Sequence, residues 1–262
     1  MHPLVNIAVS AARSAGNVIL KHSERVETLQ VDRKQHNDFV TLVDRNAEAE
    51  IIRTILKAYP DHAILGEESG SSGGDSEVRW IIDPLDGTTN FLHRIPHYAV
   101  SIGIEVRGRL EHGVIYAPCT NDLYTASRGA GAMLNSRRLR CSNTKDLDEA
   151  LIGTGVPLRE EFMPDYLKML GHVATSTAGV RRAGSAALDL AYVAAGRLDG
   201  FFEFNLKPWD VAAGIVLVQE ASGVIKPLAG DDDVLNHGHI LAASYKLVDA
   251  LESRLKPLSL GD

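Results

Sequence analysis

The chain has 262 residues, 45% of them hydrophobic and 23% charged, and a formal net charge of −7. A chain of this length and composition can bury a substantial core and is not a disordered one. Its acidic balance argues against nucleic acid or a membrane surface as a partner bound by charge alone. Two cysteines, Cys119 and Cys141, are too few for a disulfide framework, which favours a cytoplasmic location, and no stretch is apolar enough to span a membrane.

The first elements predicted from the amino terminus are helices. Helical spacing of apolar residues predicts a helix over residues 3–22, and Arg13 within it favours an amphipathic helix over a signal peptide. A second helix is predicted from Val43 to Ala58, ended by Pro60. Residues 70–77 (GSSGGDSE) are predicted to form a mobile surface loop before the strand VRWIID.

The rest of the chain divides into a β region and an alternating region. From Ala99 to Thr125 the pattern turns to β, with three branched-chain and aromatic runs separated by short turns, which predicts an antiparallel meander. Strands and helices then alternate: LIGTG, helix 163–173, GVRRAG, helix 185–195, DGFFEF, helix 210–221, HILAAS and helix 246–255. This alternation indicates a more parallel, layered α/β unit, and because no linker separates the halves we expect one shared core.

Polar residues crowd the end of the strand VRWII, in the stretch DPLDGTT. We expect Asp83 at the carboxyl end of the strand, where open α/β sheets bind ligands, and Pro84 to end the strand. Asp86 then returns toward Asp83, and the carbonyl of Leu85 can face the same point. These are the oxygen ligands that Mg²⁺ prefers. An Asx turn with a helix cap is the alternative interpretation of D-P-x-D.

Gly87, Thr88 and Thr89 favour the metal interpretation. Free amides at a helix start bind anions, and Gly87 permits close approach of a phosphate. Thr88 can orient a water molecule beside the metals. Carboxylates, amides and a hydroxyl in one turn therefore suit metal-assisted hydrolysis of a phosphate ester.

The remaining polar candidates each have a simpler structural interpretation. Glu67 in ILGEES is either a site residue or a solvated loop carboxylate. Asp210 in KPWD precedes an apolar helix and stands where a helix N-cap belongs. Asp44 looks like an acid at a helix start, and Arg181, shortly before the helix start at Gly184, looks like surface charge.

The motifs GEES, WIIDPLDGTTNF and PWDVAAG, in this order and spacing, resemble the inositol monophosphatase family of Mg²⁺-dependent, lithium-sensitive phosphatases. The bacterial branch named for an extragenic suppressor is the most similar, and the resemblance covers nearly the whole chain. It implies a mixed α/β (α+β) fold, a layered α-β-α-β-α sandwich of the sugar phosphatase type. A single domain is expected, with an antiparallel-sheet half (1–140) and an α/β half (141–262), and the family is commonly dimeric.

The resemblance also implies metal ligands. Glu67, Asp83 and the carbonyl of Leu85 would hold one Mg²⁺ ion. Asp83, Asp86 and Asp210 would hold a second, with Asp83 bridging, and Glu67 with waters could hold a weaker third. Two or three Mg²⁺ ions are thus the expected cofactor, and they would offset the repulsion between clustered carboxylates and a phosphate.

Catalytic and substrate roles follow from the same resemblance. Thr88, hydrogen-bonded to Asp44 and close to Glu67, would position and help deprotonate the attacking water, and the amides of Gly87 and Thr88 would bind the phosphate. Lys34 corresponds to a basic residue on a mobile loop that closes over the site. The hydroxyl-bearing part of the substrate would contact Asp210, Gly184, Ser185, Ala186 and Glu203.

Three functions are compatible with these residues. The leading one is hydrolysis of myo-inositol 1-phosphate to myo-inositol and phosphate by a metal-activated water. The second is the same chemistry on fructose 1,6-bisphosphate, a 3′-phosphonucleotide or histidinol phosphate. The third is a regulatory role in binding a bacterial transcription complex, through RNA polymerase or a transcription factor, with Arg181 and Arg182 as candidate contacts.

Overall fold

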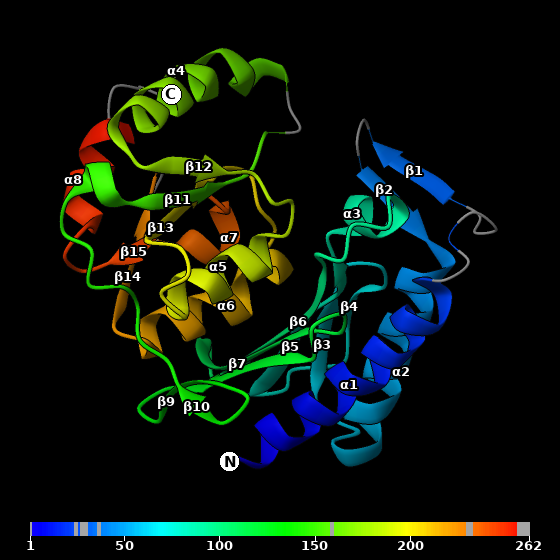
Figure 1. Cartoon of the computed structure of the whole chain (residues 1–262). Helices are drawn as coiled ribbons and strands as arrows, with labels where there is room; N and C mark the ends of the chain where they lie inside the picture. Colours follow the sequence, from blue (N-terminus) through cyan, green and yellow to red (C-terminus); the bar gives the residue numbers. More distant parts are fainter. Residues whose placement is uncertain are drawn as a thin grey trace.

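The chain folds into five alternating layers of helices and sheets (Figure 1). The structure is a computed structural model that describes residues 2–23, 26, 31–35, 38–157, 160–228 and 233–255, with the backbone alone for 31–35, 38–41 and 160. In order, the layers are α1 (Pro3–Ser23) with α2 (Leu42–Ala58), an eight-stranded sheet, α5 (Ala186–Ala194) with α6 (Pro208–Glu220), a five-stranded sheet, and α4 (Met163–Ser176) with α8 (Val248–Leu255). The predicted α-β-α-β-α sandwich is confirmed.

The larger sheet has the strand order β10-β9-β8-β7-β6-β5-β3-β4. Its strands are β3 (Ala63–Gly66), β4 (Gly70–Ser72), β5 (Val78–Asp86), β6 (Ala99–Val106), β7 (Arg109–Ala117), β8 (Asp122–Ser127), β9 (Gly131–Leu134) and β10 (Arg137–Arg138). Every neighbouring pair is antiparallel except β3 and β5. The antiparallel meander predicted from Ala99 to Thr125 is therefore confirmed. A separate antiparallel ribbon joins β1 (Val31–Gln35) to β2 (Asp38–Thr41).

The smaller sheet has the strand order β12-β11-β13-β15-β14. Its strands are β11 (Leu151–Thr154), β12 (Gly179–Arg181), β13 (Gly200–Glu203), β14 (Gly223–Pro227) and β15 (Ile240–Ser244). β11 runs parallel to β12 and β13, but β15 runs antiparallel to β13 and β14. The prediction of a more parallel unit thus holds for one side of this sheet. Two short helices complete the fold, α3 (Thr88–Leu92) and α7 (Val234–His237).

Two sequence predictions are corrected by the larger sheet. Residues 70–72 were predicted to lie in a loop, but they pair with β3 as the short edge strand β4. Pro84 was predicted to end its strand, but β5 continues to Asp86 through a register shift between Asp83 and Asp86. Proline lacks an amide donor and is tolerated inside a sheet where a bulge interrupts the ladder. Pro84 therefore marks a bulge and not a strand end.

Helix α6 lies against the larger sheet at unusually close range. Gly103 of β6 and Gly113 of β7 are cross-strand partners. A Cβ atom added to Gly103 would lie 2.5 Å from the Cβ atom of Ala212, and one added to Gly113 would lie 2.5 Å from the carbonyl oxygen of Ala213. The absence of side chains at these two paired glycines lets the helix backbone seat directly on the sheet.

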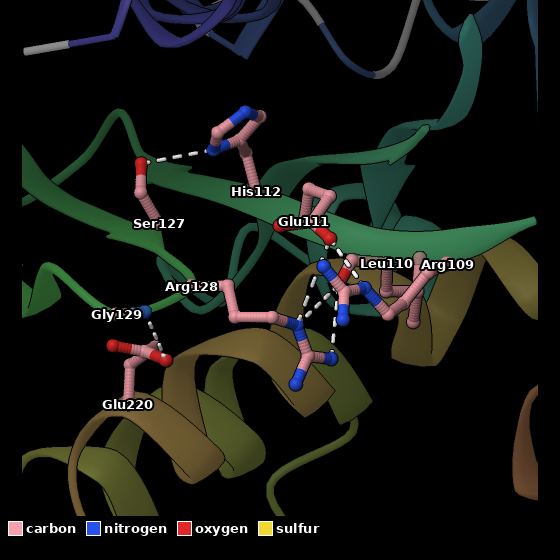
Figure 2. A network of polar contacts seen from close by, with 8 residues as sticks. All are labelled: Arg109, Leu110, Glu111, His112, Ser127, Arg128, Gly129 and Glu220. Atoms are coloured by element: carbon pink, nitrogen blue, oxygen red, sulfur yellow. Dashed lines mark hydrogen bonds and ion pairs between the residues drawn. The ribbon is translucent and has the colours of Figure 1, made fainter. Parts of the chain in front are cut away.

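Both ends of α6 are also tied to the larger sheet. Near its first turn, the hydroxyl of Ser101 donates a hydrogen bond to the carbonyl oxygen of Trp209 (3.2 Å). At its last turn, the Glu220 carboxylate accepts from the amide of Gly129 (2.9 Å) in the β8–β9 turn (Figure 2). It also accepts from the amide of Gly131 (2.7 Å), the first residue of β9. These contacts fix the position of the helix that carries Asp210 relative to the strand that carries Asp83.

We expect Gly113→Ala to destabilise the protein by about 2–3 kcal/mol, because the new methyl group meets helix backbone that cannot rotate away. The matched substitution is Gly171→Ala in α4, where an added Cβ meets nothing within 4 Å. That change should stabilise the helix by up to about 1 kcal/mol. Urea unfolding of the two variants measures both effects. Equal unfolding midpoints for Gly113→Ala and Gly171→Ala would contradict the close packing of α6 on the sheet.

Among the described residues, no helix is both long and apolar enough to cross a membrane.

Candidate functional site

The first two carboxylates meet because β3 and β5 are parallel neighbours. Gly66, the last residue of β3, pairs with Ile82 of β5, and the amide of Glu67 donates to the Ile82 carbonyl oxygen (3.1 Å). Parallel strands end at the same edge of a sheet, so Glu67 lies beside Asp83. The bulge then holds Asp83 inward at 2% exposure, where its Oδ1 accepts from the amide of Leu85 (2.9 Å).

Asp86 connects the two halves of the chain. Its Oδ2 atom accepts hydrogen bonds from the hydroxyl of Ser185 (2.5 Å) and from the amide of Ala187 (2.8 Å). Ser185 is also the N-cap of α5 and accepts from the amide of Leu188 (3.3 Å), so the helix start predicted at this position is confirmed. The carboxylate of Asp86 is therefore held at the amino end of α5.

Asp210 comes from the first turn of α6. The helix begins at Pro208, so Asp210 is its third residue and not the N-cap that its position suggested. Its Oδ2 accepts from the amide of Lys207 (2.6 Å), which is the reciprocal half of a capping box. The side chain of Asp210 thus caps the helix locally and also lies beside Asp86 and Glu67.

A hydroxyl and a carboxylate form a second polar pair next to the bulge. The hydroxyl of Thr88 lies 2.9 Å from Oδ1 of Asp44 and 3.0 Å from the carbonyl oxygen of Leu85. Asp44, in the first turn of α2, is 1% exposed. Gly87 precedes the pair with φ of 95°, and an added Cβ would lie 3.3 Å from the carbonyl oxygen of Gly184. The Thr88–Asp44 hydrogen bond that the resemblance implied is present.

A cavity of about 170 Å³ adjoins these carboxylates. Residues from both halves of the chain line it: Asp86, Thr154, Gly155, Val156, Arg182, Gly184, Ser185, Ala186, Asp189, Glu203, Leu206 and Asp210. Glu203, the last residue of β13, lies against Gly155 so closely that a Cβ there would overlap its carboxylate. The positions expected to contact the substrate alcohol therefore share one cavity.

Burial and mutual repulsion dominate the electrostatics. Burial raises the pKa of Asp83 well above its usual range, and the charges of Glu67, Asp86 and Asp210 raise it further. Burial likewise raises the pKa of Asp86 to about 6, although the hydrogen bonds from Ser185 and the α5 amides oppose this shift. The pKa of Asp210 is raised by burial and by Asp86, against the effect of the Lys207 amide.

This donor set fits hard divalent cations. Asp83 is surrounded by carboxylates, and no protein cation is among the groups that shift its pKa. Four carboxylates and a carbonyl oxygen are the ligands that Mg²⁺ selects, and an ion would relieve their repulsion. Within the described part of the chain, no three acidic, imidazole or thiol groups are already gathered as a ready metal cluster. Asp83, Asp86 and Asp210 each accept a hydrogen bond from a protein donor through one carboxylate oxygen.

Two supporting residues escaped the sequence analysis. Glu48, 2% exposed, accepts from the amides of Glu68 (3.0 Å) and Ser69 (2.8 Å) and so holds the chain that follows Glu67. Asn90, 7% exposed, donates through Nδ2 to the carbonyl oxygens of His97 (2.8 Å) and Ala183 (2.9 Å), which ties α3 to the start of α5. Glu48 stands four residues after Asp44 on one face of a helix, a spacing that could have indicated it.

Two further residues singled out in the sequence belong to other elements. Lys34 was expected on a loop, but its backbone belongs to strand β1, and its side chain lies outside the described residues. Arg181 is exposed on the edge strand β12, whereas the exposed Arg182 also lines the cavity and is therefore more than surface charge.

The layered sandwich is that of the sugar phosphatase fold class. A sequence model of the inositol monophosphatase family matches residues 1–257, and the chain belongs to this family. Nus factor SuhB of Pseudomonas aeruginosa is 51% identical over 263 residues, covering 98% of this chain and 97% of that protein.

Solved structures agree with this assignment. The crystal structure of extragenic suppressor protein SuhB from Bartonella henselae is similar with a TM-score of 0.95 and 45% identity, covering 98% of this chain and 99% of that one. Inositol monophosphatase from Anabaena (Nostoc) sp. PCC 7120 is similar with a TM-score of 0.87 and 38% identity, covering 98% of each chain.

Proposed function

We propose that the protein hydrolyses a small phosphate monoester with Mg²⁺, and that myo-inositol 1-phosphate is its substrate. The observation that carries this proposal is the group of carboxylates around the buried Asp83, whose pKa is shifted by no cation among the described residues, beside the hydrogen-bonded pair Thr88–Asp44. Membership of the inositol monophosphatase family supports it, as does the similarity to a structure named inositol monophosphatase.

The carboxylates are proposed to hold two Mg²⁺ ions and a weaker third. Glu67, Asp83 and the carbonyl oxygen of Leu85 would hold one Mg²⁺ ion, and Asp83, Asp86 and Asp210 a second, while Glu67 with waters would hold a weaker third. Bound ions would neutralise the phosphate and lower the pKa of a coordinated water. The remaining residues then have to place the ester and the water.

Thr88 is proposed to orient the attacking water. Because its hydroxyl proton is donated toward Asp44 or the Leu85 carbonyl, its lone pairs remain free to accept a hydrogen bond from water. Glu67, nearby, would take the water proton. The amides of Gly87 and Thr88 would bind phosphate oxygens, and the cavity at Glu203, Gly184, Ser185 and Ala186 would hold the alcohol.

We expect Thr88→Val to lower kcat by roughly 100-fold or more, because the isosteric side chain keeps its volume but cannot accept from water. Thr88→Ser should retain most of the activity, since it keeps the hydroxyl. Steady-state phosphate release measures both variants. Equal losses for Val and Ser would contradict the role of the hydroxyl.

A substrate panel tests the proposed function. Phosphate release is measured with Mg²⁺ on myo-inositol 1-phosphate, fructose 1,6-bisphosphate, a 3′-phosphonucleotide and histidinol phosphate, with and without millimolar Li⁺. We expect the highest kcat/KM on the inositol ester and inhibition by Li⁺. If another ester is hydrolysed and the inositol ester is not, the proposed substrate is wrong and the proposed Mg²⁺-dependent hydrolysis still holds.

A binding role is a second candidate, favoured by the similarity to proteins named Nus factor SuhB. The partner would be RNA polymerase or another part of a transcription complex, contacted near the exposed Arg181 and Arg182. Complementation of a deletion strain separates the two roles. Rescue by Asp83→Asn but not by Arg181→Glu would favour binding, and the reverse result would favour catalysis.

We further propose a cytoplasmic homodimer. The thiols Cys119 and Cys141 are free, which suits a reducing compartment. Light scattering of the purified protein measures the number of copies.

A further inference from the structure

Asp189 is a buried acid that the proposed mechanism does not use. It lies in α5, is 2% exposed, and its Oδ1 atom has no hydrogen-bond partner among the described residues. The other buried polar atoms without partners are Arg79 Nε, His97 Nε2, Ser142 Oγ and Ser244 Oγ, and none of these residues lines the cavity. An unsatisfied buried carboxylate is costly, so its position at the cavity wall calls for a ligand.

The fold leaves room for this carboxyl group beside Glu203. Gly153 near the end of β11 and Gly155 just after it stand in place of larger residues. A Cβ on Gly153 would lie 3.5 Å from Cγ of Asp189, and one on Gly155 would overlap the Glu203 carboxylate. The charge of Asp189 also raises the pKa of Glu203, which places the two groups close together. Asp189 and Glu203 thus lie on one cavity wall, beside the glycines at the end of β11.

Structural and metal-binding roles do not account for Asp189. The N-cap of α5 is Ser185, so Asp189 is not needed to start the helix. The charges that shift its pKa are those of Asp86 and Arg182, whereas Glu67 and Asp83 are not among them. Asp189 lines the cavity together with Asp86 and Asp210 but belongs to none of the proposed ligand sets.

We propose that Asp189 is a specificity-determining residue that accepts a hydrogen bond from the substrate hydroxyl next to the one held by Glu203. This inference rests on the proposed function and names a residue that would select, among its substrates, esters whose ring carries two adjacent free hydroxyls. Two neighbouring acceptors match two neighbouring hydroxyl donors, and a substrate lacking one donor leaves a buried acceptor unpaired.

The test compares two esters and three variants. The esters are myo-inositol 1-phosphate and cyclohexyl phosphate, which has the same ring size without free hydroxyls. The variants are Asp189→Ala, Asp189→Asn and, as a control on the outer layer, Asp165→Asn. We expect Asp189→Ala to lower kcat/KM about 10- to 100-fold on the inositol ester, mainly through KM, with less than about 3-fold change on cyclohexyl phosphate. Asp189→Asn should lose less, and Asp165→Asn should change neither ester.

Thermal unfolding distinguishes a substrate-binding role of Asp189 from a structural role, because the two roles predict different changes in Tm. Removal of a buried carboxyl with an unpartnered oxygen should leave Tm unchanged or raise it. A lower Tm for both Asp189 variants, or equal losses on the two esters, would overturn the inference. If the Asp189 variants are active and have the same selectivity between the two esters as the wild type, the inference about Asp189 is overturned and the proposed function is not. If the wild-type protein hydrolyses neither ester, the proposed function is overturned as well.

Discussion

Replacement of Asp83 by Asn should reduce Mg²⁺-dependent phosphate release by at least about 1,000-fold, because the proposed bridging ligand loses its charge. The same change should raise the Tm of the metal-free protein, since Asp83 is 2% exposed and its neighbours Glu67, Asp86 and Asp210 repel it. Opposite signs for activity and stability distinguish a metal ligand from a core residue.

The matched control is Asp75→Asn in an exposed turn, which should change neither quantity. Magnesium binding, measured by calorimetry, should be lost in Asp83→Asn and retained in Asp75→Asn. If the Asp83 variant were inactive and also less stable without metal, the carboxylate would be supporting the fold, and the proposed ligand role would be wrong.

The stability of the metal-free protein should depend on the charge of Asp86. Its pKa is raised to about 6 in the folded state from 3.8, so between these values the folded protein binds more protons than the unfolded chain. Stability contributed by this group is therefore present at pH 4 and is lost as the pH rises through 6. At pH 7 the loss is about 2–3 kcal/mol.

Asp86→Asn isolates this effect from the histidines, several of which have lowered pKa values and act in the opposite direction. The variant mimics the protonated acid. Without metal it should match the wild type at pH 4 and exceed its stability at pH 7, as measured by urea unfolding. With saturating Mg²⁺ at pH 7 the order should reverse, and a pH-independent difference would contradict the prediction.

The sequence predicted those features that depend on local pattern. The helices and the meander follow from spacing within short windows, and the structure has them. The behaviour of Pro84 was not predictable in this way, because a proline ends a strand or marks a bulge according to the neighbouring strand. Asp210 was mistaken for an N-cap for a similar reason, since both positions suit an acid near the start of a helix.

Residues recognised only through distant contacts were missed. Asp189 is one polar position in an apolar helix, and its significance comes from strands that lie elsewhere in the sequence. Glu48 likewise acts on amides twenty residues away. The prediction that residues 70–72 form a loop failed because edge pairing with β3 depends on the strand beside it and not on their own Gly and Ser composition.

The close seat of α6 on Gly103 and Gly113 has a consequence for synthesis of the chain. The strands that carry these glycines end at Val106 and Ala117, whereas the helix begins only at Pro208. At about 5–20 residues per second, a ribosome leaves that face of the larger sheet uncovered for several seconds. A nascent chain at that stage presents an apolar surface and an incomplete set of carboxylates. Trapping by a chaperone, or aggregation, should therefore be greatest for chains arrested before Pro208.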